Sequence, residues 1–270
     1  MSPLAPTRPR LAYGFGGPAG APALVFVNGL GGSKEAWYHQ VVAFKRSHRV
    51  LCFDQRGTGG SEPGEGPVGC RDLARDLLGL LTLVGVYRAV IVGISFGGRV
   101  ALELAFGWPG RVVGLALCGS TGGGPGAPVG DPPAHALLRR AGMLTAEEWR
   151  EGVFPALFGQ AYRERNAHRL ERLARWWAAH PQPQEGIARQ WQAWDAFDRW
   201  GDLPGLRCPT LVLHGDSDAL CPPENGRRLA HRIPGARLVL LEGLGHSPNV
   251  EDPQAFNEAL RGFLGEVGHR

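Results

Sequence analysis

The first pattern in the sequence that points to chemistry is a serine between closely spaced glycines. The segment Gly93-Ile94-Ser95-Phe96-Gly97 comes directly after the apolar run AVIV and before a stretch with helical character. A serine on a tight turn between a strand and a helix needs small residues two positions away on either side, and Gly93 and Gly97 meet that need. Such a turn would present the Ser95 hydroxyl as a nucleophile.

Two later segments carry a carboxylate and a histidine in comparable positions. HGDSD at 214–218 comes directly after the apolar run TLVL, and GLGHSP at 243–248 comes directly after LVLL. Residues that follow parallel strands meet at the carboxyl edge of the sheet, where ligands of α/β proteins bind. The sequence therefore predicts that an aspartate, Asp216 or Asp218, and His246 lie at the same edge as the serine.

These three residue types suit nucleophilic catalysis. A histidine has the right pKa to remove the proton of a serine, and a carboxylate holds the histidine in the correct tautomer. The chain order Ser95, aspartate, His246, with each residue just after a strand, is the nucleophile–acid–base order of α/β-hydrolases. The strand that follows the serine helix ends in CGSTG, which has no carboxylate, so the acid is expected from 214–218.

A glycine-rich loop completes the set of candidate groups. Asn28-Gly29-Leu30-Gly31 follows the apolar run ALVFV and is well placed to present a backbone N–H to an oxyanion. We expect the N–H of Leu30 to be one oxyanion donor and that of Phe96, at the start of the serine helix, to be the other.

The elements that must position these groups alternate along the chain. Short β-rich apolar runs alternate with helical stretches, which predicts a mostly parallel sheet with helices on both faces. The expected strands are 23–27, 50–53, 89–92, 112–117, 210–213 and 238–241, and the expected helices are 35–44, 71–83, 97–106, 225–231 and 253–264.

This alternation is interrupted between residues 122 and 200. The interruption opens with the flexible stretch GGGPGAPVGDPP, continues with helical patterns only and holds six of the eight tryptophans. We interpret it as a helical cap between two parts of a core, 1–121 and 201–270. Most of its aromatic residues are expected to pack the cap, and a minority to line an apolar substrate pocket.

Composition excludes several other classes of protein. The net charge of +4 is mild and its charges are interspersed, which argues against nucleic acid as a partner. Five cysteines without a CxxC pair fit neither a disulfide framework nor a zinc site, and no metal or organic cofactor is implied. The start MSPLAPTRPR lacks the apolar region of a signal peptide, and the apolar stretch 77–86 is too short to span a membrane. We therefore expect a cytoplasmic protein without a membrane partner, with a homodimer left open.

At this point the chain resembles the α/β-hydrolase superfamily over nearly its whole length. DQRGTGGS at 54–61 is similar to the D-x-R-G-x-G-x-S loop of that family, GDSDALCP at 215–222 to its G-x-x-D-x-x-x-P, and GLGHSPNVEDP at 243–253 to its G-x-G-H-x-x-x-x-E-x-P. The second similarity singles out Asp218 as the acid. NGLGG and DQRGTG most resemble enzymes of the 3-oxoadipate enol-lactonase type, although Asn28-Gly29 stands where the superfamily usually has His-Gly.

The resemblance implies a cofactor-independent serine hydrolase that cleaves an ester or lactone through an acyl-enzyme on Ser95. In that mechanism His246 is the base and Asp218 orients it. The same three residues also serve cofactor-free perhydrolases, carbon–carbon bond hydrolases and acyltransferases, which fold alone does not separate. From another class, a ligand receptor on the same fold would combine tight binding with slow or absent turnover.

Overall fold

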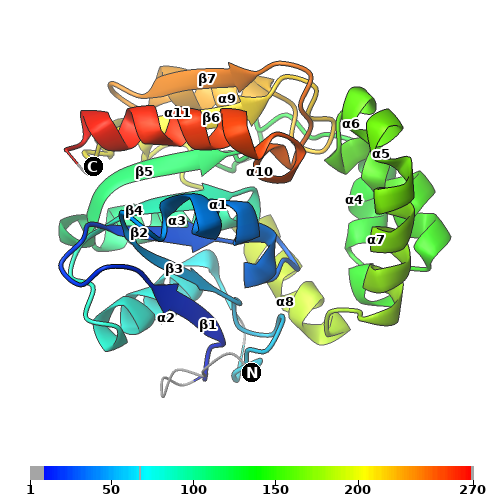
Figure 1. Cartoon of the computed structure of the whole chain (residues 1–270), viewed down its shortest axis with the longest axis horizontal. Coiled ribbons are helices and arrows are strands. Elements are labelled where there is room, and N and C mark those ends of the chain that lie inside the picture. The colour runs from blue at the N-terminus through cyan, green and yellow to red at the C-terminus, as the bar shows by residue number, and fades with distance from the viewer. Residues whose placement is uncertain (1–8, 67, 269–270) are drawn as a thin grey trace.

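The computed structural model describes residues 9–66 and 68–268, and its centre is a seven-stranded sheet (Figure 1). The strands are β1 (Tyr13–Gly16), β2 (Ala23–Val27), β3 (Arg49–Phe53), β4 (Ala89–Ile94), β5 (Val112–Cys118), β6 (Thr210–Gly215) and β7 (Arg237–Leu241). Their order across the sheet is β1-β3-β2-β4-β5-β6-β7. All neighbours pair in parallel except β1, which pairs antiparallel with β3 at one edge. The predicted mostly parallel α/β sheet is confirmed.

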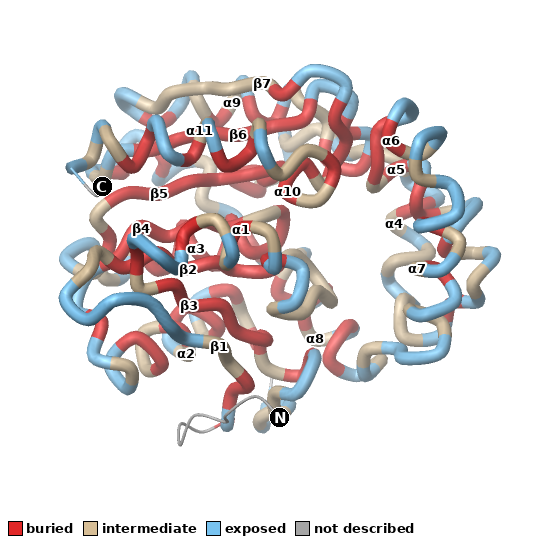
Figure 2. Tube along the Cα trace, in the orientation of Figure 1, coloured by how far each residue is buried: buried red, intermediate tan, exposed pale blue. Residues whose placement is uncertain are grey.

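Helices cover both faces of the sheet. Outside the segment between β5 and β6, the α-helices of the described chain are α1 (Tyr38–Phe44), α2 (Cys70–Leu83), α3 (Phe96–Gly107), α9 (Glu224–Arg232), α10 (Pro248–Glu251) and α11 (Pro253–Glu266). A 3₁₀ turn at Lys34–Trp37 leads into α1, and another at Pro109–Arg111 leads into β5. The inner strands β2, β3, β4, β5 and β6 are almost wholly buried between these helices, whereas the edge strands β1 and β7 are only partly buried (Figure 2).

Alternate side chains of the strands build two separate cores. Val25 and Ile91 pack into the core that α2 and α3 cover, whereas their neighbours Phe26 and Val92 pack into the core under α1 and α11. Successive strand side chains point to opposite faces, so a strand buried on both faces must be apolar throughout. This requirement explains the unbroken apolar runs ALVFV and AVIV.

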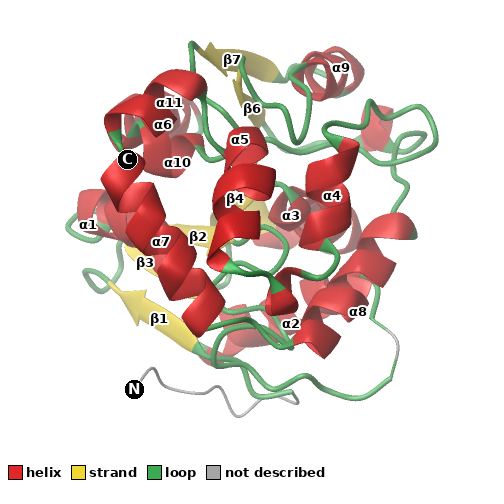
Figure 3. Ribbon diagram, turned by 90° about the vertical axis from the view of Figure 1, so that its right-hand side faces the viewer, coloured by secondary structure: helices red, strands yellow, loops and turns green. Residues whose placement is uncertain are grey.

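The segment between β5 and β6, residues 119–209, is called the inserted segment below. It contains α4 (Pro132–Leu138), α5 (Phe154–Leu157), α6 (Gln160–Arg165), α7 (Ala167–Ala179) and α8 (Gln184–Asp195), with short turns at Ala141–Met143, Glu148–Val153 and Leu203–Gly205. These helices lie beyond the carboxyl ends of the strands and in front of them in Figure 3. The interpretation of residues 122–200 as a helical cap remains a prediction.

One strand and one α-helix of the core are not predicted by the sequence. β1 is a four-residue edge strand with two glycines, and α10 is a single turn that directly precedes α11. The prediction about a signal peptide concerns residues 1–10, of which 1–8 lie outside the described chain. Within the described residues, no helix is both long enough and apolar enough to cross a membrane.

Candidate active site at the carboxyl edge

Ser95 occupies a strained turn between β4 and α3. Its φ of 53° and ψ of −120° make it the one residue other than glycine with positive φ in the described chain. A Cβ at Gly93 would lie 2.4 Å from the Gly97 carbonyl oxygen, and a Cβ at Gly97 would lie 2.3 Å from the Val27 carbonyl oxygen. Both flanking glycines are therefore required, and backbone strain of this kind is typical of functional positions.

Hydrogen bonds from the next strand hold this turn in place. The Ser95 N–H donates to the carbonyl of Cys118 at 2.7 Å, and the Ser120 hydroxyl donates to the carbonyl of Ser95 at 2.8 Å. Gly119, with φ of 51°, packs against the aspartate and histidine: a Cβ there would lie 3.2 Å from His246 Nδ1. The motif CGSTG carries no sequence signal for this supporting role, which depends on β5 lying beside β4.

Asp218 and His246 form a buried pair at the same edge. His246 Nδ1 lies 2.8 Å from Asp218 Oδ2, and the other carboxylate oxygen accepts the N–H of Cys221 at 2.8 Å. His214 Nε2 is also 3.3 Å from Oδ2 and 2.7 Å from the carbonyl oxygen of Cys221. Burial by itself would raise the pKa of Asp218, but attraction to His246 and the hydrogen bonds from both histidines outweigh it and lower this pKa.

Asp216 lies in the same loop but makes different contacts. It is exposed, and its Oδ1 accepts the N–H of Gly243 at 2.8 Å and the hydroxyl of Ser217 at 3.0 Å. The bond from Gly243 ties the loop after β6 to the loop after β7. The aspartate that contacts His246 in the structure is Asp218.

The His246 loop is fixed by Glu251 and by the inserted segment. Glu251 accepts the N–H groups of Gly245 and Ser247 in the loop and that of Gly159 between α5 and α6, at distances of 2.7–3.2 Å. Burial raises the pKa of Glu251, although these hydrogen bonds act in the opposite direction. The N–H of His246 itself donates to the carbonyl of Leu157 at 3.0 Å. The histidine is thus anchored from both parts of the molecule.

The loop after β2 lies directly beside the serine. A Cβ on Gly29 would stand 3.4 Å from Ser95 Cβ, so the backbone of the loop approaches the nucleophile closely. Asn28 is buried; its Nδ2 donates to the carbonyl of Phe53 at 2.9 Å, and its own carbonyl accepts Nε2 of Gln55 at 2.8 Å. These bonds link the start of the loop to the segment that follows β3.

The two expected oxyanion donors flank Ser95 in the structure. Phe96 is fully buried and begins α3, and Leu30 is half-buried in the loop that Gly29 brings against the serine. Within the described chain, the Ser95 hydroxyl makes no hydrogen bond to His246. A bond of this kind is often loose in ligand-free enzymes and tightens only when substrate binds.

The tryptophans of the inserted segment divide into groups. Trp191 and Trp194 on α8 lie with ring centroids 5.7 Å apart, and Trp194 lies 6.3 Å from Phe96. His135 on α4 packs 5.8 Å from Trp191, and both burial and the charge of His246 lower the pKa of His135. Trp149 instead packs into a small core of its own within the inserted segment. Of these tryptophans, Trp194 is the one whose ring contacts Phe96, the residue expected to supply an oxyanion donor.

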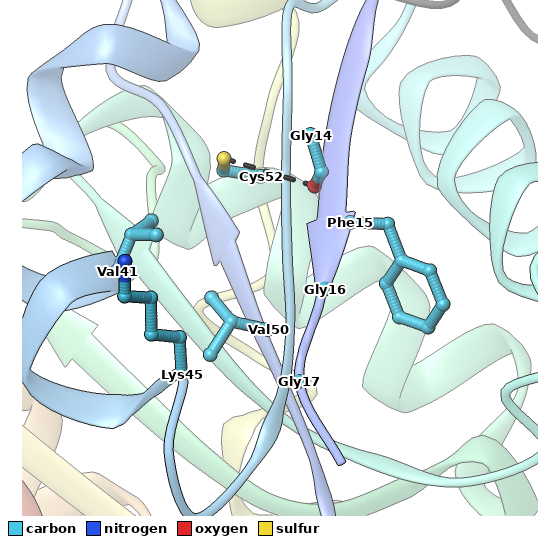
Figure 4. Close-up of a pocket in the computed structure, with 8 residues that line it drawn as sticks. All are labelled: Gly14, Phe15, Gly16, Gly17, Val41, Lys45, Val50 and Cys52. Atoms are coloured by element: carbon cyan, nitrogen blue, oxygen red, sulfur yellow. Dashed lines mark hydrogen bonds between the residues drawn. The ribbon is translucent and has the colours of Figure 1, made fainter. Parts of the chain in front are cut away.

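A separate cavity of about 240 Å³ lies away from these groups, between β1, β3 and α1 (Figure 4). Its lining includes Val50, near the start of β3, and therefore lies toward the edge of the sheet opposite Ser95. Burial raises the pKa of the Cys52 thiol in this cavity to about 11, which leaves a poor nucleophile. Within the described chain, no group of three or more His, Cys, Asp or Glu side chains is arranged to hold a metal ion.

Comparison with known proteins assigns the chain to one family. Residues 24–259 match the alpha/beta hydrolase family, as the resemblance implied. The chain is 33% identical to "Putative carbamate hydrolase RutD" of Pseudomonas savastanoi pv. phaseolicola over 254 residues, which cover 91% of this chain and 95% of that protein.

Solved structures agree with this assignment. An enol-lactonase from Burkholderia xenovorans has a TM-score of 0.85 and 33% identity, with 97% of this chain and all of that chain covered. A thermophilic esterase from Thermogutta terrifontis has a TM-score of 0.79 and 31% identity, with 96% and 94% covered.

Proposed function

Because this chain belongs to the alpha/beta hydrolase family, we propose that it hydrolyses a carboxylic ester or lactone through an acyl-enzyme on Ser95. The observation that carries the proposal is the buried contact of 2.8 Å between Asp218 and His246, at the sheet edge that also holds the strained Ser95 turn. An aspartate and histidine in contact beside a serine are the parts that serine activation requires.

In the acylation step, Ser95 Oγ attacks the substrate carbonyl carbon while His246 Nε2 takes the hydroxyl proton. The negative charge that forms on the carbonyl oxygen is stabilised by the N–H groups of Leu30 and Phe96. The carbon–oxygen bond to the leaving group then breaks, and His246 returns its proton to the departing alkoxide. A lactone keeps that alcohol tethered to the acyl group.

Deacylation repeats these roles with water as the nucleophile. His246 removes a proton from the water as it attacks the acyl carbon, and then gives the proton to Ser95 Oγ as the ester bond breaks. The products are a carboxylic acid and the free serine. Asp218 keeps the proton of His246 on Nδ1, so that Nε2 is free to act as the base.

The inserted segment is the proposed cap over this site. Trp194 packs on Phe96 and Trp191 packs on Trp194, so we infer that this pair lines the pocket for the acyl group. A compact apolar acyl group suits such a surface. No metal or organic cofactor takes part in the proposed steps.

Carbamate hydrolysis is the second candidate, favoured by the similarity to RutD proteins. A carbamate carbonyl is open to the same attack by Ser95, and what distinguishes it from an ester is the nitrogen bonded to the carbonyl carbon. Perhydrolysis, carbon–carbon bond cleavage and acyl transfer also use this triad and differ in the substrate or in the molecule that accepts the acyl group.

A substrate panel tests the proposal. The purified protein and its Ser95→Ala variant are assayed with p-nitrophenyl esters, lactones and carbamates. We expect ester or lactone turnover that disappears in Ser95→Ala. Equal activity of the variant would remove Ser95 from the mechanism, and tight binding of these compounds without turnover would support the receptor alternative.

A further inference from the structure

Gln190 of α8 joins the inserted segment to the loop that carries Leu30. Its side chain is 1% exposed, and its Oε1 accepts the N–H of Gly31 at 2.7 Å across 159 residues of sequence. We propose that Gln190 is a positioning residue for the oxyanion site, so that the site is complete only when α8 is seated on the core. This inference rests on the proposed function, because it concerns the oxyanion of that reaction.

The direction of this hydrogen bond follows from the groups involved. A backbone N–H can only donate, so the acceptor must be the carbonyl oxygen of the Gln190 amide. Its NH₂ group is buried and has no hydrogen-bond partner in the described chain. The bond to Gly31 is therefore the hydrogen bond that this amide makes within the described chain.

The loop is held between α8 and the serine. Gly31 has a φ of 65°, and a Cβ at this position would lie 2.7 Å from Cδ1 of Ile187, one turn before Gln190 on α8. On the other side, Gly29 packs against Ser95. Residues 29–31 therefore have little freedom to move while α8 is in place, and the Leu30 N–H lies within this stretch.

α8 also contacts the segment that carries the second donor. Trp194 packs on Phe96, and its carbonyl accepts Nη1 of Arg99 on α3 at 2.7 Å. The Arg99 guanidinium lies 3.4 Å from the centroid of the Trp194 ring. One helix of the inserted segment thus supports both halves of the oxyanion site, through Gln190 on the Leu30 side and Trp194 on the Phe96 side.

The test compares two glutamines of the inserted segment. Gln190→Met removes the acceptor for Gly31. Gln182→Met is the matched control, because Gln182 Oε1 accepts the N–H of Gly59, in a different core loop, at 2.6 Å. Both variants lose a bond between the inserted segment and a core glycine, but only the first bond reaches the oxyanion loop.

Four quantities are measured on each variant. They are kcat and KM for a p-nitrophenyl ester, the inhibition constant of a short alkyl trifluoromethyl ketone, and the amide hydrogen exchange rate of the peptide that contains Gly31. For Gln190→Met we expect kcat to fall by about 10- to 100-fold, less than the roughly 10²- to 10³-fold loss seen when an oxyanion donor is removed outright. KM should change little. The ketone, whose adduct carries the oxyanion, should bind more weakly by a similar factor, and the Gly31 peptide should exchange faster.

Gln182→Met should stay within about threefold of the wild type in all these quantities, as most substitutions remote from a site do. Unchanged kcat and ketone binding in Gln190→Met would overturn the inference, and so would an equal loss in Gln182→Met. If Gln190→Met does not fold, Gln190→Ala removes the same acceptor and takes its place. A wild-type protein without turnover or ketone binding would instead overturn the proposed function.

Discussion

His246 Nδ1 lies 2.8 Å from Oδ2 of Asp218, whereas Asp216, only two residues earlier, accepts the N–H of Gly243 and remains exposed. The two carboxylates belong to one loop but have different surroundings. Asp218 is buried, and His246 and His214 both approach its Oδ2, whereas Asp216 forms part of a solvated turn. This difference gives a direct way to test which of them is the acid.

Asp218→Asn should lower kcat by two to four orders of magnitude, since an asparagine in the equivalent role of a well-studied protease costs about 10⁴. Asp216→Asn is the matched control and should keep activity within roughly tenfold, because the asparagine oxygen can still accept the N–H of Gly243 in this exposed turn. Circular dichroism must first show that both variants are folded. An inactive Asp216→Asn beside an active Asp218→Asn would mean that the acid is assigned wrongly.

Glu251→Gln should impair the His246 loop. The carboxylate accepts N–H groups from Gly159, Gly245 and Ser247, and an amide cannot accept all three. We expect the free energy of unfolding to fall by about 1–3 kcal/mol, which is typical of buried donors left unpaired. We also expect a lower kcat, because His246 loses its support.

Chemical denaturation and ester hydrolysis measure the two effects. Glu258→Gln, an exposed change on α11, serves as the control and should alter neither quantity. Wild-type stability together with wild-type kcat in Glu251→Gln would show that the loop does not depend on this carboxylate.

The acyl pocket should favour short or compact acyl groups, because the proposed pocket is lined by Trp194, which packs on Phe96, and by Trp191 behind it. We expect kcat/KM for p-nitrophenyl esters to fall as the acyl chain grows from four to sixteen carbons. Trp194→Leu should shift this preference toward longer chains. Trp176→Ala, at an exposed position of α7, should not change it. A steady rise of kcat/KM with chain length in the wild type would contradict the prediction.

Local patterns in the sequence predict the sheet well. Six of the seven strands are recognisable as apolar runs, and the five of them inside the sheet are almost wholly buried, which leaves a strong signal. The sixth, β7, is a half-buried edge strand whose run LVLL is still apolar. β1 leaves no such signal: its sequence YGFG is short, glycine-rich and only partly buried. The inserted segment is predicted as helical, but its π-helical turn at Glu148–Val153 is not.

The contacts that support the site are much harder to predict. Gln190 lies far along the chain from Gly31, and Gly159 is 92 residues from Glu251. No local periodicity connects such pairs, because they meet only after the inserted segment packs on the core. Ser120 is equally inconspicuous, since its role depends on β5 lying next to β4. Residue type and position after a strand identify candidate reactive groups, whereas their supports follow from tertiary structure.

The central claim is that Ser95 is the nucleophile, and labelling with a fluorophosphonate probe tests it most directly. Only an activated serine reacts with such a reagent. The labelled protein is digested and the modified peptide is identified by mass spectrometry, in parallel with a folded Ser95→Ala variant. If Ser95 is the nucleophile, we expect one modified residue, Ser95, and no labelling of the variant. Modification at another residue, or equal labelling of Ser95→Ala, would contradict that claim.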